Sequence, residues 1–186
     1  MSASRVVLIG VGGGIAAYKT VEVASALVKA GHEVHVAMTA AARHLVTPTT
    51  FASITRRRVI AEMFPPAEQT DGEDLFPHLY PATRADVFLV APATADLIAR
   101  FAAGLADDVV CCSAVALRPE CRRVFCPSMN ANMWANPTVR ANARRLEESG
   151  WRRIGPAEGA LACGTTGVGR MSEPAEIVAA LADALR

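Results

Sequence analysis

The sequence predicts an α/β protein built on one doubly wound parallel sheet. Short apolar and β-branched runs alternate along the chain with longer segments whose apolar residues recur at helical spacing. No internal repeat interrupts this alternation, and 186 residues are enough for a single domain, residues 1–186, with a sizeable core. Because parallel neighbours are joined by crossover helices, the handedness of such crossovers fixes most of the topology.

Each predicted element has its own local signal. Four short runs rich in apolar and β-branched residues are expected to be strands, at residues 6–9, 33–38, 86–92 and 123–126. The segments between them carry helical spacing with polar caps, a first-turn proline or a closing glycine. Helices are expected over 15–29, after the capping residue Thr39, over 95–103 after Thr94, over 107–117, over 136–149 and over 173–185. Residues 64–77 and 155–171 fit neither period and are expected to be loops.

The composition excludes several classes of function. A formal charge of +1 gives no electrostatic footprint for nucleic acid or for an acidic membrane surface. No apolar run reaches the roughly 18 residues of a membrane span. The chain enters a strand pattern almost at once, which argues against a cleaved signal peptide. Five cysteines without C-x-x-C spacing favour neither a metal site nor a disulfide framework, so a reduced, cytoplasmic protein is expected.

The most distinctive string is Pro127-Ser128-Met129-Asn130-Ala131-Asn132-Met133-Trp134. It stands where the strand at 123–126 should hand over to a helix. Ligands bind in open α/β sheets at this carboxyl end of the strands. The amide of Asn130 can hydrogen-bond a substrate there without carrying charge. The string therefore predicts a binding site.

A glycine turn, Gly12-Gly13-Gly14, follows the first strand. Glycines let the backbone approach an anion closely, and the start of the next helix offers N–H groups to it. The spacing is not a dinucleotide fingerprint, and the second strand ends in Met38-Thr39 rather than in an acid. A phosphate ligand other than a dinucleotide fits better, although a plain tight turn would also explain the glycines.

Three further positions are candidates for chemistry, each with a simpler alternative. Small residues around Thr94 leave room for a flat ring at a strand end, although Thr94 would also serve as a plain helix cap. His78 precedes a central strand and could act as a base near neutral pH, or be a surface histidine. Cys163 in a glycine-rich loop predicts an accessible thiol, unlike Cys111, Cys112 and Cys126, which are expected to be packed in apolar segments. Such a loop could also close over a substrate.

These segments occur together and in this order in one family. The chain resembles the flavin-dependent cysteine decarboxylases, most closely the phosphopantothenoylcysteine decarboxylases of coenzyme A biosynthesis. The resemblance covers nearly the whole chain. It rests on Gly13–Lys19, His78, Ala91–Asp96, Pro127–Trp134 and Ala162–Met171.

The resemblance implies a Rossmann-like, flavodoxin-like subunit with a C-terminal substrate-clamp loop. FMN would lie between neighbouring subunits of a homotrimer or a dodecamer. Ten implied FMN-binding residues are Gly13, Gly14, Ile15, Thr39, Ala41, Thr94, Ala95, Asp96, Leu97 and Ser128. The implied catalytic and substrate residues are His78 as base, Asn130 as holder of the carboxylate, Cys163 as proton donor, and Met129, Met133 and Ala162 beside the substrate.

The implied chemistry removes CO₂ from a cysteinyl carboxylate that has no electron sink of its own. Oxidation of the cysteinyl Cβ by flavin gives a thioaldehyde, which accepts the electrons as CO₂ leaves. In the pantothenate pathway hydride then returns while an acid, here Cys163, supplies a proton. Asn130 suits this reaction because a neutral donor binds the carboxylate without strongly stabilising its charge. The expected reaction converts 4′-phosphopantothenoylcysteine to 4′-phosphopantetheine in the cytoplasm, with no nucleic-acid or membrane partner.

Three departures from the family pattern leave the substrate open. Thr165 stands where many relatives have Asp, Ser128 replaces a common alanine, and Tyr80-Pro81 replaces a Glu-Leu type pair after His78. The alternative substrate is the C-terminal cysteine of a ribosomally made precursor peptide, which would give an aminoenethiol. Cys163 favours the pantothenate substrate, whereas Tyr80-Pro81 favours the peptide. A flavin-binding regulatory subunit and a flavin prenyltransferase are disfavoured, the first by the three catalytic residue types together and the second by the Pro-x-Met-Asn string.

Overall fold

The computed structural model describes residues 4–64, 76–160, 164 and 166–185. Five parallel strands form its main sheet, in the order β2-β1-β3-β4-β5. Their bounds are β1 (Val6–Val11), β2 (Glu33–Met38), β3 (Val87–Ala93), β4 (Arg122–Pro127) and β5 (Arg152–Arg153). This is the flavodoxin-like order, in which the winding direction reverses between β1 and β3. The predicted doubly wound parallel sheet is confirmed.

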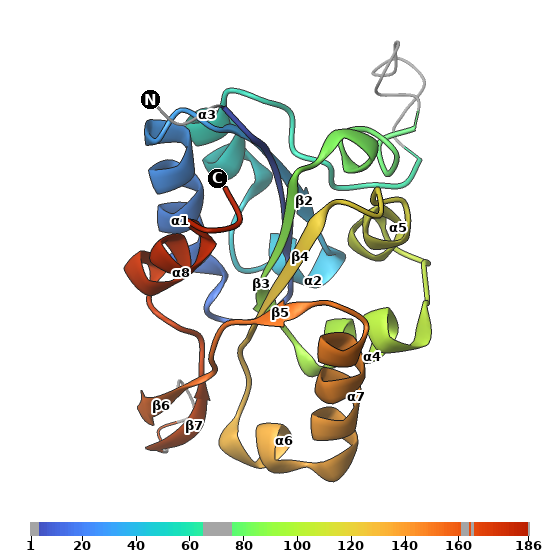
Figure 1. Cartoon of the computed structure of the whole chain (residues 1–186). Coiled ribbons are helices and arrows are strands. Elements are labelled where there is room, and N and C mark those ends of the chain that lie inside the picture. The colour runs from blue at the N-terminus through green and yellow to red at the C-terminus, as the bar shows by residue number, and fades with distance from the viewer. Residues whose placement is uncertain (1–3, 65–75, 161–163, 165, 186) are drawn as a thin grey trace.

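Helices cover both faces of this sheet (Figure 1). They are α1 (Ala17–Lys29), α2 (Ala40–Arg43), α3 (Pro48–Thr55), α4 (Ala95–Ala103), α5 (Val109–Val115), α6 (Ala131–Ala135), α7 (Pro137–Glu148) and α8 (Pro174–Leu181), with a 3₁₀ turn at Ala82–Arg84. Helices α1, α3 and α8 pack on one face, and α4, α5 and α7 pack on the other. Alternate strand residues serve the two faces: Val7 and Ile9 join the first core, and Leu8 joins the second.

Polar caps fix where the helices begin at the carboxyl end of the sheet. The Thr39 hydroxyl accepts a hydrogen bond from Ala42 N at 3.1 Å, and the Thr94 hydroxyl accepts one from Leu97 N at 3.2 Å. Each cap satisfies an N–H that the helix itself cannot pair and stabilises it by about 1 kcal/mol. Both start positions agree with the sequence prediction. The predicted helix over 107–117 is shorter, because the Asp108 side chain caps α5.

The prediction of a loop over 155–171 is wrong for most of its length. Strands β6 (Ala157–Ala160) and β7 (Thr166–Arg170) form an antiparallel hairpin there. Its glycines allow close packing: a Cβ on Gly169 would lie 2.3 Å from the Met129 carbonyl oxygen. A glycine-rich sequence therefore marks close backbone approach here rather than irregular structure. Helices α3 and α6 and strand β5 were not predicted at all.

No helix within the described ranges is long and apolar enough to cross a membrane. The same ranges hold no group of three or more His, Cys, Asp or Glu residues placed to bind a metal ion. Most of the predicted surface loop over 64–77 lies outside them, at residues 65–75.

Candidate active site

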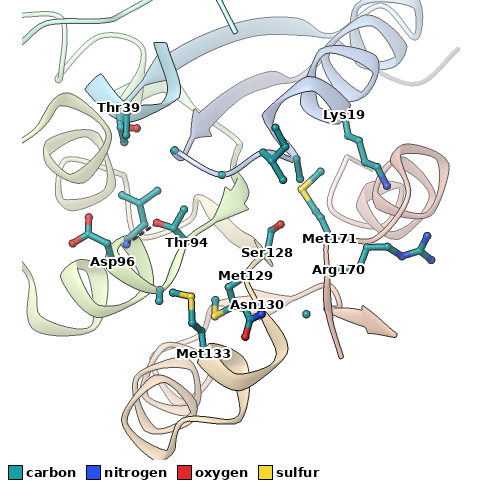
Figure 2. Close-up of a pocket in the computed structure, with 18 of the residues that line it drawn as sticks. Lys19, Thr39, Thr94, Asp96, Ser128, Met129, Asn130, Met133, Arg170 and Met171 are labelled. Atoms are coloured by element: carbon teal, nitrogen blue, oxygen red, sulfur yellow. Dashed lines mark hydrogen bonds between the residues drawn. The ribbon is translucent and has the colours of Figure 1, made fainter. Parts of the chain in front are cut away.

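The carboxyl ends of β1, β2, β3 and β4 open onto a pocket of about 900 Å³. It lies at the point where the strand order reverses, which is the ligand site of flavodoxin-like sheets. The loops after these four strands line it, together with residues of the β6–β7 hairpin and the segment that leads into α8. Figure 2 shows this arrangement, and the volume is in the range of small-molecule and cofactor sites.

The turn after β1 lies directly against neighbouring backbone. Gly12 N donates to the Pro92 carbonyl at 3.2 Å, and a Cβ on Gly13 would lie 2.3 Å from the Cβ of Ala41. Helix α1 begins at Ala17, its N-cap residue Ala16 provides no side-chain hydrogen bond, and its first turn holds no acidic residue. Although Ala17 N and Lys19 N already donate to the carbonyls of Gly14 and Ala16, the positive end of the helix dipole is well suited to a phosphate.

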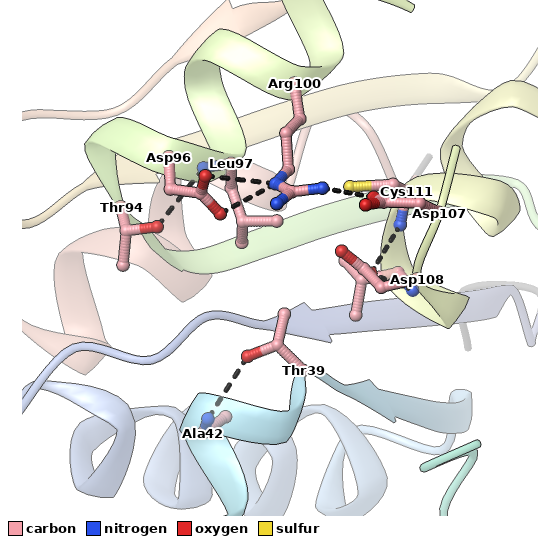
Figure 3. A network of polar contacts seen from close by, with 10 residues as sticks. Thr39, Ala42, Thr94, Asp96, Leu97, Arg100, Asp107, Asp108 and Cys111 are labelled. Atoms are coloured by element: carbon pink, nitrogen blue, oxygen red, sulfur yellow. Dashed lines mark hydrogen bonds and ion pairs between the residues drawn. The ribbon is translucent and has the colours of Figure 1, made fainter. Parts of the chain in front are cut away.

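One side of the pocket carries a network of opposite charges (Figure 3). Arg100 Nε lies 3.0 and 2.9 Å from the two carboxylate oxygens of Asp96, and its Nη1 pairs with Asp107. The hydrogen bond to Asp107, and after it the one to Asp96, raises the pKa of Arg100. The same bond from Arg100 lowers the pKa of Asp107. Asp108 caps α5 by accepting from Val110 N at 2.8 Å. The Arg100 charge is thus matched by two carboxylates at this side.

The Pro127–Trp134 string runs from the end of β4 into α6, and its residues Ser128, Met129, Asn130 and Met133 line the pocket. Ser128 N donates to the Ala93 carbonyl at 3.1 Å, and Met129 N donates to the Gly169 carbonyl at 2.9 Å. Asn130 caps α6, because its Oδ1 accepts from Asn132 N at 2.8 Å. This bond fixes the orientation of the amide, so that its nitrogen is the donor end. The strand-to-helix handover predicted from the sequence is present.

Comparisons with known proteins agree with this geometry. The family model described as Flavoprotein matches residues 1–186. The chain belongs to the Flavoprotein family. This Flavoprotein chain is 40% identical over 177 residues to the coenzyme A biosynthesis bifunctional protein CoaBC of Vibrio cholerae, covering 95% of the chain and 43% of that relative. It therefore spans less than half the length of the CoaBC relatives that it matches.

Other relatives match the Flavoprotein chain along nearly their whole length. A probable phosphopantothenoylcysteine decarboxylase of Streptococcus mutans is 35% identical over 170 residues, covering 91% of the chain and 93% of that protein. A cysteine-to-serine mutant of PPC decarboxylase complexed with pantothenoylaminoethenethiol has a TM-score of 0.84 at 25% identity, over 96% of this chain and 97% of that one. The FMN-dependent cysteine decarboxylase SpaF has a TM-score of 0.79 at 29% identity, over 100% of this chain and 99% of that one. The resemblance stated from the sequence and the fold class are confirmed.

The pocket brings together most of the residues singled out from the sequence. All ten predicted FMN-binding residues line it, and so do Met129, Asn130 and Met133. Ala162 and Cys163 lie outside the described residues. The roles of all these residues remain predictions.

His78 is not brought to this pocket by its own chain. It lies in the turn at 76–81, which precedes the amino end of β3, whereas the pocket is at the carboxyl end. Its Nδ1 is buried, and no hydrogen-bond partner for it exists among the described residues. His78 is therefore not among the residues that line this pocket within the single chain.

Sequence reasoning missed several charged residues that line the pocket, namely Lys19, Arg100, Asp107, Asp108 and Arg170. Two of them had a sequence signal. Arg100 stands four residues after Asp96, and Arg170 stands three residues before Glu173, spacings that pair charges. Lys19 closes the Gly13–Lys19 motif, but its pairing had no local signal, because its partner Glu173 is distant in the sequence.

Two of the three thiols that were expected to be packed, Cys111 and Cys126, are buried in the structure. Burial raises the pKa of both, to about 12 for Cys126. Such thiols stay protonated and unreactive at neutral pH. Cys121 is buried as well, whereas Cys112 is only partly buried.

Proposed function

We propose that this chain is an FMN-dependent decarboxylase of a cysteinyl carboxylate. Its substrate is 4′-phosphopantothenoylcysteine and its product is 4′-phosphopantetheine, an intermediate of coenzyme A biosynthesis in the cytoplasm. The observation that carries the proposal is the meeting of the glycine turn, the Thr94–Leu97 segment and the Asn130 amide in one pocket at the reversal of strand order. The similarity to CoaBC and to phosphopantothenoylcysteine decarboxylase supports the choice of substrate.

The residues present fit FMN. The turn at Gly13 has no room for a side chain, and the start of α1, with the positive end of its dipole and no acidic residue in its first turn, lines the pocket beside it. Thr39 and Ala41 stand beside that turn, and Thr94, Ala95 and Leu97 line the wall expected for the flavin ring. When bound, FMN supplies the ability to take a hydride from a substrate carbon and to return it.

The chain's own residues bind and orient the substrate. The Asn130 amide donates to the substrate carboxylate, while Met129 and Met133 line the same part of the pocket with apolar surface. A neutral donor in apolar surroundings orients the carboxylate yet leaves its charge poorly stabilised, which favours the loss of CO₂. Cys163, which lies outside the described residues, supplies the proton that the product requires.

His78 acts as the base in the pocket of a neighbouring subunit. Large apolar side chains near the pocket support such an assembly, because they are 43 to 59 % exposed in the single chain. They are Ile15, Tyr18, Met133 and Val168. Exposed apolar residues grouped in this way mark contact surfaces. A homotrimer, alone or as four trimers in a dodecamer, would cover them and complete each site.

The departure at Tyr80-Pro81 has packing contacts within the chain. The Tyr80 ring meets the His35 ring edge-on at 5.6 Å, and its hydroxyl accepts from Arg84 Nη1 at 2.8 Å. Tyr80 thus packs against residues of its own chain.

The test compares the two substrates on the FMN-loaded protein. Incubation with 4′-phosphopantothenoylcysteine should yield 4′-phosphopantetheine by mass spectrometry without an added reductant. Cys163→Ser should release CO₂ and then stop at the aminoenethiol, which absorbs in the near ultraviolet. Turnover of a peptide ending in cysteine, with the pantothenate compound left untouched, would contradict the proposal.

A further inference from the structure

A cationic pair lies at one side of the pocket, across from the Arg100 network. Figure 2 shows Lys19 and Arg170 together on one side, with Thr39 and Asp96 on the opposite side. Both cationic side chains line the pocket. They come from α1 and from the end of β7, elements that the sequence separates by more than a hundred residues.

Glu173 holds the two cations in place. Lys19 Nζ lies 2.8 and 2.9 Å from the two carboxylate oxygens of Glu173, and Arg170 Nη1 lies 3.0 Å from Oε1. The Lys19 side chain is only 14% exposed. The hydrogen bonds from Lys19 keep the pKa of Glu173 below its ordinary value, so this carboxylate stays ionised at neutral pH.

This side of the pocket has more positive than negative charge. Two cations share one carboxylate here, whereas Arg100 on the opposite side faces both Asp96 and Asp107. The cationic pair can therefore accept an anion without losing its existing ion pairs.

Arg170 also has a donor that lacks an acceptor. Its Nε is buried and has no hydrogen-bond partner in the part of the chain that the structure describes. The guanidinium lies across β6, where a Cβ on Gly159 would come within 2.9 Å of Nε. A buried N–H without a partner is unfavourable, so an acceptor from a ligand would stabilise this arrangement.

We propose that Lys19 and Arg170, positioned by Glu173, bind a phosphate monoester at the far end of the substrate and so select the phosphorylated compound. The inference rests on the proposed function and deepens it. The glycine turn beside Thr39 accounts for the cofactor phosphate, which leaves the cationic pair for the substrate. A phosphate monoester carries a charge of about −1.5 to −2 at pH 7, which the surplus positive charge complements. An unmodified peptide that ends in cysteine carries no phosphate monoester.

The experiment uses two probes that differ only in the phosphate, 4′-phosphopantetheine and pantetheine. Their dissociation constants are measured by calorimetry on the FMN-loaded wild type, Lys19→Gln, Arg170→Gln and the control Arg144→Gln, an exposed arginine of α7. The wild type should bind the phosphorylated probe more tightly by about tenfold or more, the effect of a charged hydrogen bond. Each pocket variant should bring the ratio towards one, and Arg144→Gln should leave it unchanged.

Kinetics give the matching readout. In Arg170→Gln, KM for 4′-phosphopantothenoylcysteine should rise while kcat at saturation stays within about twofold, because the phosphate is remote from the reacting carbon. Added salt should reduce the preference of the wild type for the phosphorylated probe, a measurement that needs no variant. A preference that is independent of salt would contradict the proposal.

The two proposals fail in different ways. If both pocket variants keep the wild-type binding ratio, the cationic pair does not bind the phosphate, even when the wild type releases CO₂. If the wild type releases no CO₂ yet binds 4′-phosphopantetheine about tenfold more tightly than pantetheine, the proposed reaction is wrong and the phosphate site is supported.

Discussion

Gly13 and Ala41 touch so closely that a Cβ on the glycine would lie 2.3 Å from the Cβ of the alanine. The turn after β1 and the start of α2 are therefore pressed together where the cofactor phosphate is expected. We predict that Gly13→Ala weakens FMN binding, because the turn must move away from α2. The measurement is the flavin absorbance per protein after purification, with the dissociation constant from fluorescence titration.

The same contact provides a rescue. Ala41→Gly removes the Cβ that the new side chain would meet, so the double variant should regain FMN relative to Gly13→Ala. Ala41→Gly alone is the control, since glycine in a helix costs about 1 kcal/mol relative to alanine. A double variant that binds FMN no better than Gly13→Ala would show that the contact does not control the turn.

Asn130 has two roles that two substitutions can separate. Aspartate caps helices as well as asparagine does, so Asn130→Asp should keep α6 and the bound flavin. It should abolish turnover, because a carboxylate would repel the substrate carboxylate. Asn130→Ala should lose both functions and destabilise the fold by about 1 kcal/mol. Activity is measured as CO₂ release and stability as the free energy of unfolding in urea; full activity in Asn130→Asp would refute the assigned role.

If His78 and Asn130 of different subunits share a site, two inactive variants should complement each other. Equal amounts of His78→Asn and Asn130→Asp are unfolded, mixed and refolded together with FMN. Roughly a quarter of the sites in a randomly mixed oligomer would then combine wild-type His78 with wild-type Asn130. The expected outcome is recovery of activity to about that fraction. A mixture that stays as inactive as its two components would place both residues in one subunit or in no common site.

Stability should depend on pH through His35. Its side chain is buried, which lowers its pKa, although Nε2 lies 2.8 Å from Glu33 Oε1, a bond that raises it, and Arg57 and Arg84 lower it further. The unfolded chain therefore binds a proton on His35 more readily than the folded chain does. Stability is full above the unfolded pKa of about 6.5 and is lost as pH falls towards the folded value.

We therefore predict that the melting temperature falls as the pH is lowered from about 7.5 to about 5.5. His35→Gln should flatten this slope, and His44→Gln, at an exposed histidine, should not. Glu33, whose pKa is lowered mainly by its hydrogen bond to His35, acts in the same direction but in a more acidic range. Equal slopes for the wild type and His35→Gln would contradict the prediction.

The sequence was most informative where local chemistry decides the structure. Thr39 and Thr94 are side-chain caps whose signal is contained within four residues, and both helices begin where that signal predicts. The parallel strands were predicted for the same reason, since their apolar runs are local. Because the carboxyl ends of parallel strands share one edge, the residues after them met in one pocket as expected.

The sequence was least informative where distant segments meet. Gly167 and Gly169 have the composition of a loop, but in the structure Gly167 packs against the Ala131 Cβ and Gly169 packs against the Met129–Ala131 backbone. The Lys19–Glu173 pair has no local spacing that could reveal it. His78 is not among the residues that line the pocket with Asn130 in the single chain, although the sequence analysis expected both in one site.

The most direct measurement follows the labelled carboxyl carbon of 4′-phosphopantothenoylcysteine on the FMN-loaded protein, with Asn130→Asp as the matched control. The account predicts that the wild type releases the label as CO₂ and forms 4′-phosphopantetheine, while the equally yellow control releases none. A wild type that binds FMN and leaves the labelled carboxyl in place would contradict it.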